Sequence, residues 1–525
     1  MSIDVTGRRT IPDLICERAA RYPDRTYLVV ESRAGEVTSY TYAAFLDTVQ
    51  RAARVFRDLG IRRGDAVVLH LGNRAEFLFA WFGLAWVGAI MVPSNLANTS
   101  RELKHILDHS EALGVVTSPA YADTVAAAVR SISCVKHQLL TGAGTRPETW
   151  LDFDVLLSTA PPGPCETAAV DDDVAEMLFT SGTTAAPKAV MLTHANFLRT
   201  GERASRAVAL DETDRCLTAL PLFHINAQQS AVLPSLTVGG SCVLLEEYHA
   251  STFWEQVRTH RATCVSLVAM QVRTLLAQPA RETDQQHSVR RARYSINVLT
   301  EEKERFERRF GVELLNQYGL SEAVGGVTSA PVFGEKRWPS IGLPAADLLV
   351  RIVDENDADV PIGEVGEIVV QGQPGRAVMK GYFKDPEATE AAFRGGWLHT
   401  GDQAYADEGH YLYFVDRKKD VIKRAGENVS ASEVEAVLLM HPLISEAAVI
   451  GVPDDVRDEA IKAFVVPGPS SALTVEDIRE HCARHLARFK IPTIIQFRPS
   501  LPKTSIGKVA KKVLRDEPQA GGAIR

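Results

Sequence analysis

Short apolar runs recur through the first part of this chain, with segments of helical length between them. The clearest runs are 66–71, 114–117, 241–245 and 263–267. An apolar run of about four to eight residues bounded by turn residues is typical of a strand that is buried on both faces. Strands that alternate with helices form sheets covered by helices. The first part of the chain is therefore predicted to be an α/β domain with layered sheets.

The pattern changes from about residue 363, where short alternating strands with turn residues occur at 366–372 and 409–415. They predict a β-rich subdomain that closes the large domain. After the charged stretch 416–420, the expected elements are helices 432–439 and 475–486 and strands 447–452 and 463–466. We therefore expect a large N-terminal α/β domain of several subdomains over 1–416, a hinge at 417–420 and a small α+β domain over 421–525.

The composition restricts the classes of function. With 525 residues and 45% hydrophobic content, the chain is longer than one core usually serves. Its 58 basic and 66 acidic residues give a formal charge of −8, and no basic block could follow a phosphate backbone. We therefore expect no nucleic-acid partner. The seven cysteines are scattered singly without the spacing of a metal site, so we expect reduced thiols.

The most lipid-like stretch, 77–92, is interrupted by Gly83 and Gly88 and ends at Pro93. A membrane span needs roughly 20 apolar residues, so this stretch is expected to be a buried helix that leads into a short core strand. The first residues lack the apolar core of a secretory signal. These features predict a cytoplasmic location and no membrane span.

The most distinctive segment, 179–194, reads FTSGTTAAPKAVMLTH. Small hydroxyl residues and a glycine followed by Lys188 make a loop whose hydroxyls, backbone N–H groups and ammonium group can surround a polyphosphate. The spacing differs from the Walker pattern. Taken alone, a loop rich in serine and threonine is more often only a turn, because these side chains form local hydrogen bonds. Its interpretation as a phosphate loop therefore depends on the segments that accompany it.

Four further segments accompany this loop. They read PLFH at 221–224, NQYGLSE at 316–322, TGD at 400–402 and DR at 416–417. With the loop, they resemble in residues and order the adenylate-forming superfamily, which includes acyl-CoA synthetases, luciferases and peptide-synthetase adenylation domains. The phosphate loop of that superfamily usually reads TSG[TS]TGxPKG, so Ala185 and Ala189 replace two glycines here. The resemblance spans nearly the whole chain and implies a mobile C-terminal domain.

The resemblance implies a site for ATP and Mg²⁺ in the N-terminal domain. The implied phosphate-loop contacts are Thr180, Ser181, Gly182, Thr183, Thr184 and Lys188. Tyr318, next to Gly319, would stack on adenine. Ser321 would lie near the phosphate, and Glu322 would hold Mg²⁺ through water. Thr184 is the other implied metal contact, in agreement with the preference of Mg²⁺ for a few protein oxygens together with phosphates.

Three more contacts are implied by the other segments. Asp402 would accept hydrogen bonds from both ribose hydroxyls, and Arg417 would contact the ribose or the phosphate. His224, in the PLFH segment, would lie beside the carboxylate of the acid substrate. Taken singly, each is more often a surface charge or a core histidine.

The C-terminal segments 420–430 and 501–508 resemble the two working faces of the small domain in this superfamily. Lys508 would contact the substrate carboxylate and ATP during adenylation, where a cation lessens the repulsion between two anionic reactants. Gly426 would line the tunnel for the pantetheine arm of coenzyme A, and Lys423 lies in the same cofactor-binding segment. Lys419 occupies the hinge position.

The resemblance predicts an ATP-dependent acid:CoA ligase that forms an acyl-AMP intermediate and then an acyl-CoA thioester. Within the superfamily, the chain most resembles the crotonobetaine/carnitine-CoA ligase group, through segments 337–342, 396–402, 423–430 and 457–466. A quaternary ammonium substrate would need an acid or an aromatic cage, yet segment 225–230 carries no acidic residue. We therefore expect an uncharged acid, including a bulky one, in place of carnitine.

Alternatives stay open. The alanines in the phosphate loop could leave the enzyme efficient in only one half-reaction, with a partner enzyme for the other. A carnitine- or crotonobetaine-type ligase is a second alternative, and a catalytically silent nucleotide-binding scaffold is a third. A serine hydrolase is disfavoured, because GLSEA at 319–323 misses the GxSxG pattern at its last position. A homodimer is compatible with the sequence.

Overall fold

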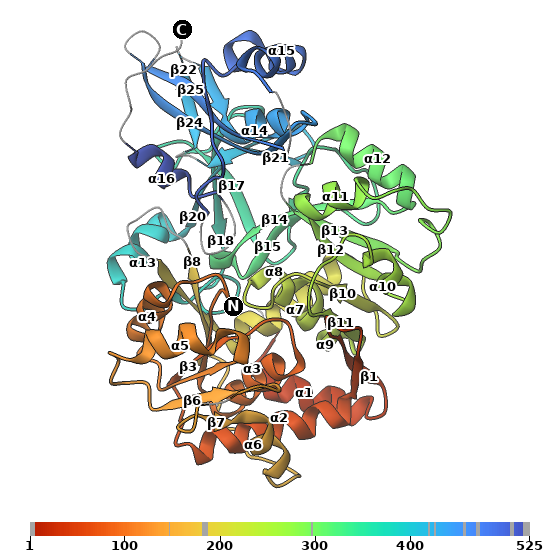
Figure 1. Cartoon of the computed structure of the whole chain (residues 1–525), viewed down its shortest axis with the longest axis vertical. Helices are drawn as coiled ribbons and strands as arrows, with labels where there is room; N and C mark the ends of the chain where they lie inside the picture. Colours follow the sequence, from red (N-terminus) through yellow and green to blue (C-terminus); the bar gives the residue numbers. More distant parts are fainter. Residues whose placement is uncertain are drawn as a thin grey trace. The chain divides into compact units, whose positions relative to one another are not determined.

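A computed structural model describes residues 6–145, 147–180, 187–295, 298–417, 420–424, 427–454, 458–468, 473–503 and 509–517. The chain divides into two compact units. The large unit comprises residues 1–296, 300–350 and 370–398, and the small unit comprises residues 297–299, 351–369 and 399–525. Figure 1 shows the elements of both units, coloured along the chain.

Mixed sheets form the centre of the large unit. One orders its strands as β19 (Gly381–Tyr382), β9 (Lys188–Thr193), β8 (Val174–Thr180), β4 (Ile90–Pro93), β3 (Ala66–His70), β5 (Gly114–Thr117), β6 (His137–Leu140) and β7 (Leu151–Asp152). The other orders them as β16 (Leu343–Pro344), β15 (Gly325–Ser329), β14 (Leu314–Leu320), β13 (Arg291–Ser295), β12 (Cys264–Val268), β10 (Arg215–Thr218), β11 (Ser241–Leu245), β1 (Thr26–Glu31) and β2 (Val37–Thr41). The strands predicted at 66–71, 114–117, 241–245 and 263–267 are β3, β5, β11 and β12, which confirms the alternating pattern.

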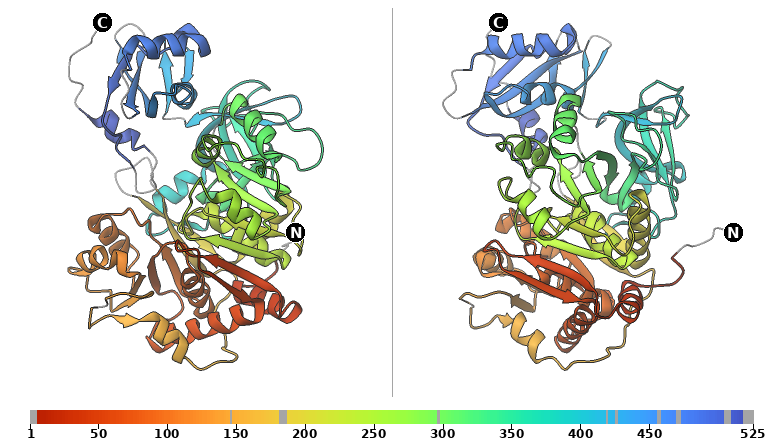
Figure 2. Two further views of the ribbon diagram at one scale, coloured as in Figure 1. Left: turned by 45° about the vertical axis from the view of Figure 1, so that its right-hand side comes forward. Right: turned by 90° about the vertical axis from the view of Figure 1, so that its right-hand side faces the viewer.

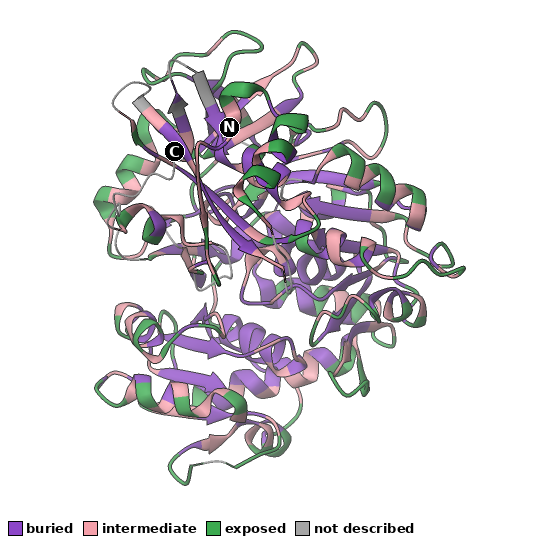
Figure 3. Ribbon diagram, turned by 45° about the horizontal axis from the view of Figure 1, so that its top comes forward, coloured by how far each residue is buried: buried purple, intermediate pink, exposed green. Residues whose placement is uncertain are grey.

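Helices pack around these strands, as the side views in Figure 2 show. They are α1 (Ile11–Arg21), α2 (Tyr42–Asp58), α3 (Ala75–Val87), α4 (Ser100–His109), α5 (Ala122–Val129), α6 (Phe153–Thr159), α7 (His194–Ala207), α8 (Ile225–Ala227), α9 (Leu233–Val238), α10 (Phe253–Thr259), α11 (Ala269–Leu276), α12 (Thr300–Phe310) and α13 (Pro386–Ala392). Figure 3 shows buried strands inside and exposed turns on the outer helices, so the core lies along the sheets.

The apolar stretch 77–92 is a buried helix followed by a core strand, as predicted. Helix α3 is buried on every side and ends at Gly88, whose φ of 74° provides the left-handed cap. Strand β4 follows at once. Gly83 lies against helix α2, where an added Cβ would be 2.7 Å from the Cβ of Ala52, so only glycine allows this approach. Within the described residues, no helix has the length and apolar character to cross a membrane.

The sheets of the small unit are mainly antiparallel. One sheet orders β17 (Leu349–Val353), β18 (Gly366–Gln371), β20 (Leu398–Ala406) and β21 (Leu412–Arg417). The next contains β23 (Glu427–Ser430), β22 (Val421–Arg424), β25 (Asp458–Pro467), β24 (Ile444–Asp454) and β26 (Ile494–Phe497). Its helices are α14 (Ala431–Leu439), α15 (Val475–His485) and α16 (Lys511–Asp516). Residues of α14 and α15 pack on one face of this sheet, and Leu514 of α16 packs on the other.

The helices predicted at 432–439 and 475–486 agree with α14 and α15 to within one residue. The strand predicted at 409–415 begins later, at Leu412, because Asp407 accepts hydrogen bonds from the N–H groups of Gly409 and Tyr411 and forms a turn. The charged pair 416–417 lies inside β21. The domain limits 1–416, 417–420 and 421–525 stay a prediction, and the hinge residue Lys419 lies outside the described residues.

Candidate functional site

The antiparallel pair of β8 and β9 holds both ends of the predicted phosphate loop. Thr180, the last residue of β8, is paired with Lys188, the first residue of β9. The Thr180 hydroxyl donates to the Lys188 carbonyl oxygen over 3.5 Å. The predicted contacts between them, namely Ser181, Gly182, Thr183 and Thr184, lie outside the described residues. The hairpin therefore fixes where the loop starts and ends.

Lys188, Tyr382 and Glu322 meet in the large unit, although they come from distant parts of the sequence. The Lys188 Nζ lies 4.9 Å from the centroid of the Tyr382 ring. The Tyr382 hydroxyl donates a 3.0 Å hydrogen bond to Glu322 Oε1. Burial raises the pKa of Tyr382, and the negative charge of Glu322 adds to the effect, so the hydroxyl stays protonated and remains a donor. The Tyr382 side chain thus contacts the ammonium group of Lys188 through its ring and the carboxylate of Glu322 through its hydroxyl.

Glu322 lies in a 3-10 turn, Ser321–Ala323 (η3), directly after strand β14. That strand carries Tyr318, which is buried, and Gly319. Gly319 has no room for a side chain, because a Cβ would lie 2.0 Å from a carbonyl oxygen of the facing strand β15. The backbone carbonyl of Glu322 accepts a 2.7 Å hydrogen bond from the N–H of Met379. The segment NQYGLSE is therefore a strand end and a tight turn that presents Glu322.

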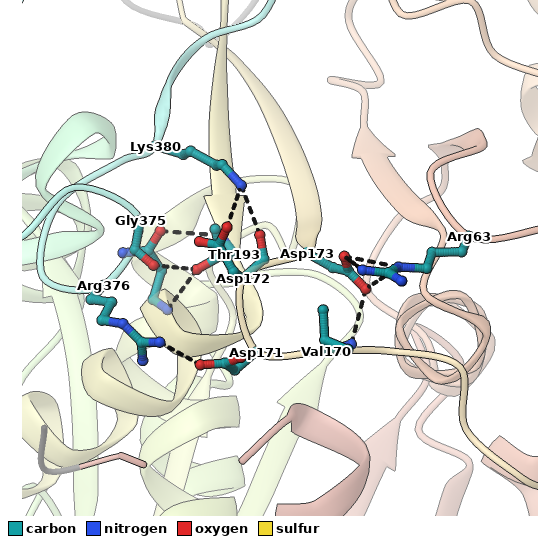
Figure 4. Close-up of polar contacts among 10 residues, drawn as sticks. Arg63, Val170, Asp171, Asp172, Asp173, Thr193, Gly375, Arg376 and Lys380 are labelled. Atoms are coloured by element: carbon teal, nitrogen blue, oxygen red, sulfur yellow. Dashed lines mark hydrogen bonds and ion pairs between the residues drawn. The ribbon is translucent and has the colours of Figure 1, made fainter. Parts of the chain in front are cut away.

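The segment 375–382, here called the strap, carries the residues that contact Glu322. Aspartates in the chain just before β8 hold it (Figure 4). The ion pairs join Asp171 to Arg376 and Asp172 to Lys380, the latter at 2.8 Å. The Thr193 hydroxyl donates a 2.5 Å hydrogen bond to the carbonyl of Gly375. The strap is therefore bound to the chain just before β8 and to the last residue of β9. These two strands carry the phosphate loop at their other ends.

His224, the predicted acyl-pocket residue, directly precedes the short helix α8. Its N–H donates a 3.1 Å hydrogen bond to the carbonyl of Pro221, which closes a turn. A π-helical turn, Gln228–Val232 (η2), follows α8, and such turns are frequent at functional sites. Within it, Gln229 Oε1 accepts a 3.0 Å hydrogen bond from the N–H of Gly326 in β15. The segment of His224 is thereby joined to the strand that follows the Glu322 turn.

Glu176 is a buried acid in the middle of β8. Gln228 donates from Nε2 to Glu176 Oε1 at 3.3 Å and to the carbonyl of Leu222 at 3.0 Å. Burial raises the pKa of Glu176 to about 8, although the hydrogen bond from Gln228 acts in the opposite direction. The carboxyl group is therefore largely neutral at pH 7. It links the strand before the phosphate loop to the segment around His224.

In the small unit, Asp402 and Arg417 face each other on the paired strands β20 and β21. The Arg417 Nε lies 3.4 Å from Asp402 Oδ1, and the side chains are 49% and 9% exposed, respectively. The N–H of Asp402 donates to the Thr400 hydroxyl at 3.1 Å. The N–H of Gly401 donates to Glu367 Oε1 at 3.0 Å. The structure therefore brings this predicted pair together and fixes the backbone beside its carboxylate.

The other predicted residues of the C-terminal region are less fully described. Lys423 is on β22, where its backbone is paired with Asn428. Gly426 and Lys508 lie outside the described residues. Their roles stay predictions.

Sequence reasoning missed Tyr382 and Glu176. An acid inside the apolar run VAEMLFT at 174–180 is an unusual residue for a buried strand, and this signal could have singled out Glu176. Tyr382 offers no local signal of this kind. Its importance arises only when the fold places the strap beside Glu322.

Glu322 fits a magnesium ion that brings phosphate ligands with it. Among the described residues, no group of three or more histidine, cysteine, aspartate or glutamate side chains is placed to hold a metal. Mg²⁺ in nucleotide sites binds through one or two carboxylates and the phosphates of the substrate. One carboxylate near the end of the phosphate loop therefore suits this ion.

The fold and the order of the motifs are those expected of an enzyme that activates a carboxylic acid with a nucleotide. The AMP-binding enzyme family matches residues 15–383, and the AMP-binding enzyme C-terminal domain matches residues 433–508. The chain belongs to the AMP-binding enzyme family. A crotonobetaine/carnitine-CoA ligase of Salmonella paratyphi C is 40% identical over 522 residues, which cover 98% of this chain and 100% of that protein.

Solved structures agree with this family. The o-succinylbenzoate CoA synthetase of Bacillus subtilis, in complex with its acyl-adenylate intermediate, superposes with a TM-score of 0.84 at 27% identity over 97% of this chain and 99% of that one. A benzoate CoA ligase of Burkholderia xenovorans LB400 gives a TM-score of 0.84 at 26% identity over 97% and 100%. The chain is therefore an AMP-forming acid–thiol ligase that uses ATP, Mg²⁺ and coenzyme A, which confirms the predicted fold class and reaction.

Proposed function

We propose that this ligase activates an uncharged carboxylic acid, including a bulky one, and that the residues named above serve its nucleotide site. The observation that carries the site assignment is the meeting of Lys188, Tyr382 and Glu322 beside the ends of the phosphate loop. An ammonium group there can offset phosphate charge, and a carboxylate oriented by a phenol can hold Mg²⁺ in the magnesium–ATP complex.

In the first step, a carboxylate oxygen of the acid attacks the α-phosphorus of ATP, and the bond to pyrophosphate breaks. The products are acyl-AMP and pyrophosphate. In the second step, the thiolate of coenzyme A attacks the acyl carbonyl, and AMP leaves. Positioning and charge stabilisation supply most of the catalysis. Lys508 is assigned to the substrate carboxylate and ATP in the first step.

The remaining assignments follow the resemblance of the motifs. The phosphates are contacted by Thr180, Ser181, Gly182, Thr183, Thr184 and Ser321. Tyr318, beside Gly319, stacks on adenine, while Asp402 and Arg417 bind the ribose. Asp402 is suited to this role because its carboxylate is held next to a cation at a fixed position in the sheet. Gly426 and Lys423 serve coenzyme A, with domain alternation about Lys419 between the steps.

His224 is assigned to the acyl pocket, and its surroundings support an uncharged acid. Segment 225–230 carries no acidic residue. The nearby Glu176 is buried with a pKa of about 8, so at pH 7 it offers little negative charge to a quaternary ammonium group. A betaine substrate is the second candidate, because relatives named crotonobetaine/carnitine-CoA ligase match the chain over 98% of its length.

An acid panel tests the substrate. Release of AMP is measured with ATP, coenzyme A and either carnitine, crotonobetaine or apolar cyclic acids. We expect turnover with the apolar acids to exceed turnover with the betaines. Robust activity on the betaines alone would contradict the proposal and establish the second candidate.

Separate assays of the half-reactions test the two remaining alternatives. Pyrophosphate exchange measures adenylation, and thioester formation from supplied acyl-AMP measures the second step. Equal competence in both removes the need for a partner enzyme. Tight ATP binding without AMP formation over a broad acid panel would favour a nucleotide-binding scaffold.

The cytoplasmic location and the homodimer belong to the proposal as well. Fractionation of cells that express the chain tests the location. Light scattering of the purified protein tests the oligomeric state.

A further inference from the structure

Arg203 of helix α7 is a buried arginine, with a side chain that is 5% exposed. Its Nε and Nη2 donate to the two carboxylate oxygens of Asp347 at 2.8 and 2.9 Å. Its Nη1 donates to the carbonyls of Ala323 and Gly326 at 2.9 and 3.2 Å. Its Nη2 also donates to the carbonyl of Ala377 at 2.9 Å. These bonds account for all five N–H donors of a guanidinium group.

The three carbonyls belong to the segments that place Glu322. Ala323 directly follows Glu322 in the 3-10 turn, and Gly326 lies on the strand after the turn. Ala377 is in the strap, close to Met379, whose N–H donates to the backbone carbonyl of Glu322. One guanidinium group therefore holds the turn and the strap at the same time.

Neighbouring residues on the same helix contact the same segments. The Thr200 hydroxyl donates a 2.9 Å hydrogen bond to the carbonyl of Val324. Asn196 donates from Nδ2 to the carbonyl of Val378 at 2.9 Å. Val324 has a φ of 57°, which is strained for a β-branched residue and persists only where the surroundings enforce it. Helix α7 thus donates hydrogen bonds both to this strained turn and to the strap.

We propose that Arg203 is a positioning residue for Glu322, which holds the turn and the strap in the one geometry that presents the carboxylate to the magnesium–ATP complex. The inference rests on the proposed function, because Arg203 acts through Glu322. A planar fork with five directed donors is needed for this role. Lysine keeps the charge but cannot make the same set of contacts.

Asp347 balances the buried cation. Burial favours the neutral acid, but the hydrogen bonds and charges of Arg203 and Arg199 outweigh it and lower the pKa of Asp347. Arg199 donates from Nε to Asp347 at 2.9 Å, and among the described residues its hydrogen bonds do not reach the backbone around Glu322. Arg199 therefore offers a matched control on the same helix.

The first experiment measures pyrophosphate exchange at graded Mg²⁺ concentrations for Arg203→Lys and Arg199→Lys. We expect Arg203→Lys to lower kcat and raise the half-saturating Mg²⁺ concentration, each about tenfold, because hydrogen bonds of a buried charged group are lost. Arg199→Lys should change both by less than about threefold, as expected for a partly exposed ion pair. Similar effects of the two variants, or an unchanged Mg²⁺ dependence in Arg203→Lys, would overturn the inference.

A double-mutant cycle separates positioning from general stability. If Arg203 acts through Glu322, Arg203→Lys costs little additional activity in a Glu322→Gln background. Additive losses would contradict the inference. Asp347→Asn serves as a second variant if Arg203→Lys folds poorly, and the same non-additivity is expected.

Hydrogen exchange gives a readout that does not depend on activity. The amides of Val324 and Met379, whose N–H groups are bonded to Ser321 and Glu322, should exchange faster in Arg203→Lys than in the wild type. Unchanged exchange there would overturn the positioning role. A wild-type enzyme without pyrophosphate exchange would instead refute the proposed function, while this measurement still tests Arg203.

Discussion

Tyr382 joins the two charged residues of the site. Its ring faces the Lys188 ammonium, and its hydroxyl donates to Glu322. A hydrogen bond to a charged acceptor contributes about 1.5 to 3 kcal/mol, and the partial exposure of Glu322 reduces this value. The phenol therefore contributes mainly to the orientation of the carboxylate.

Tyr382→Phe should lower the rate of pyrophosphate exchange by about tenfold, because the hydroxyl that orients Glu322 is lost while the ring remains. The measurement is kcat at saturating Mg²⁺ and ATP. Tyr413→Phe is the control, since it removes a hydroxyl that donates to Asp407, also at 3.0 Å. Equal losses in the two variants would show that the effect is not specific to Glu322.

Glu176 makes the stability of the fold depend on pH. Its pKa is raised from 4.5 to about 8, so the folded state keeps a proton that the unfolded state loses. Relative to Glu176→Gln, the wild type should therefore lose stability as pH rises from about 4.5 to about 8, by about 1.4 kcal/mol for each pH unit. Chemical denaturation of both proteins at several pH values measures this difference. A difference that does not vary with pH would mean that Glu176 is ionised in the folded protein.

At the scale of elements, two close approaches, one between helices and one between strands, leave room only for glycine. Helix α3 approaches α2 at Gly83, and β14 approaches β15 at Gly319. Both contacts exclude a side chain. The approach at Gly319 lies in the strand that leads into the Glu322 turn, whereas the approach at Gly83 is a buried contact between two helices.

Gly83→Ala should destabilise the large unit by about 1 to 3 kcal/mol, because the new Cβ would overlap Ala52. Thermal unfolding should show a lower midpoint. Gly72→Ala is the matched control, since its Cβ would be 3.5 Å from Leu96, an ordinary contact. Unchanged stability of Gly83→Ala would mean that the helices separate at little cost.

At the scale of the whole molecule, the sequence predicts the alternating fold and the order of the motifs because both are local patterns. Apolar runs identify β3, β5 and β11, and the residue order of 179–194 together with the segments that accompany it identifies the family. The strap and the Arg203 network could not be predicted in this way. Their partners are far apart in the sequence, and several of the contacts are made to backbone carbonyls, which no residue type reveals.

The two half-reactions should separate in a Lys508→Ala variant. Lys508 is assigned to adenylation only, so pyrophosphate exchange should fall by about a hundredfold, while thioester formation from supplied acyl-AMP should be retained. Both rates are measured on the same preparation. Parallel loss of the two rates would contradict the assignment. Lys490→Ala is the control, because Lys490 pairs with Glu433 within the small unit.

The neutral acid at the centre of β8 also affects how the protein exchanges protons with its buffer. The formal charge of −8 counts Glu176 as ionised, so the folded chain near neutral pH is one unit less negative at this position. Unfolding between the two pKa values then releases a proton into solution. The heat of unfolding measured by calorimetry must therefore contain the heat of ionisation of whichever buffer accepts that proton.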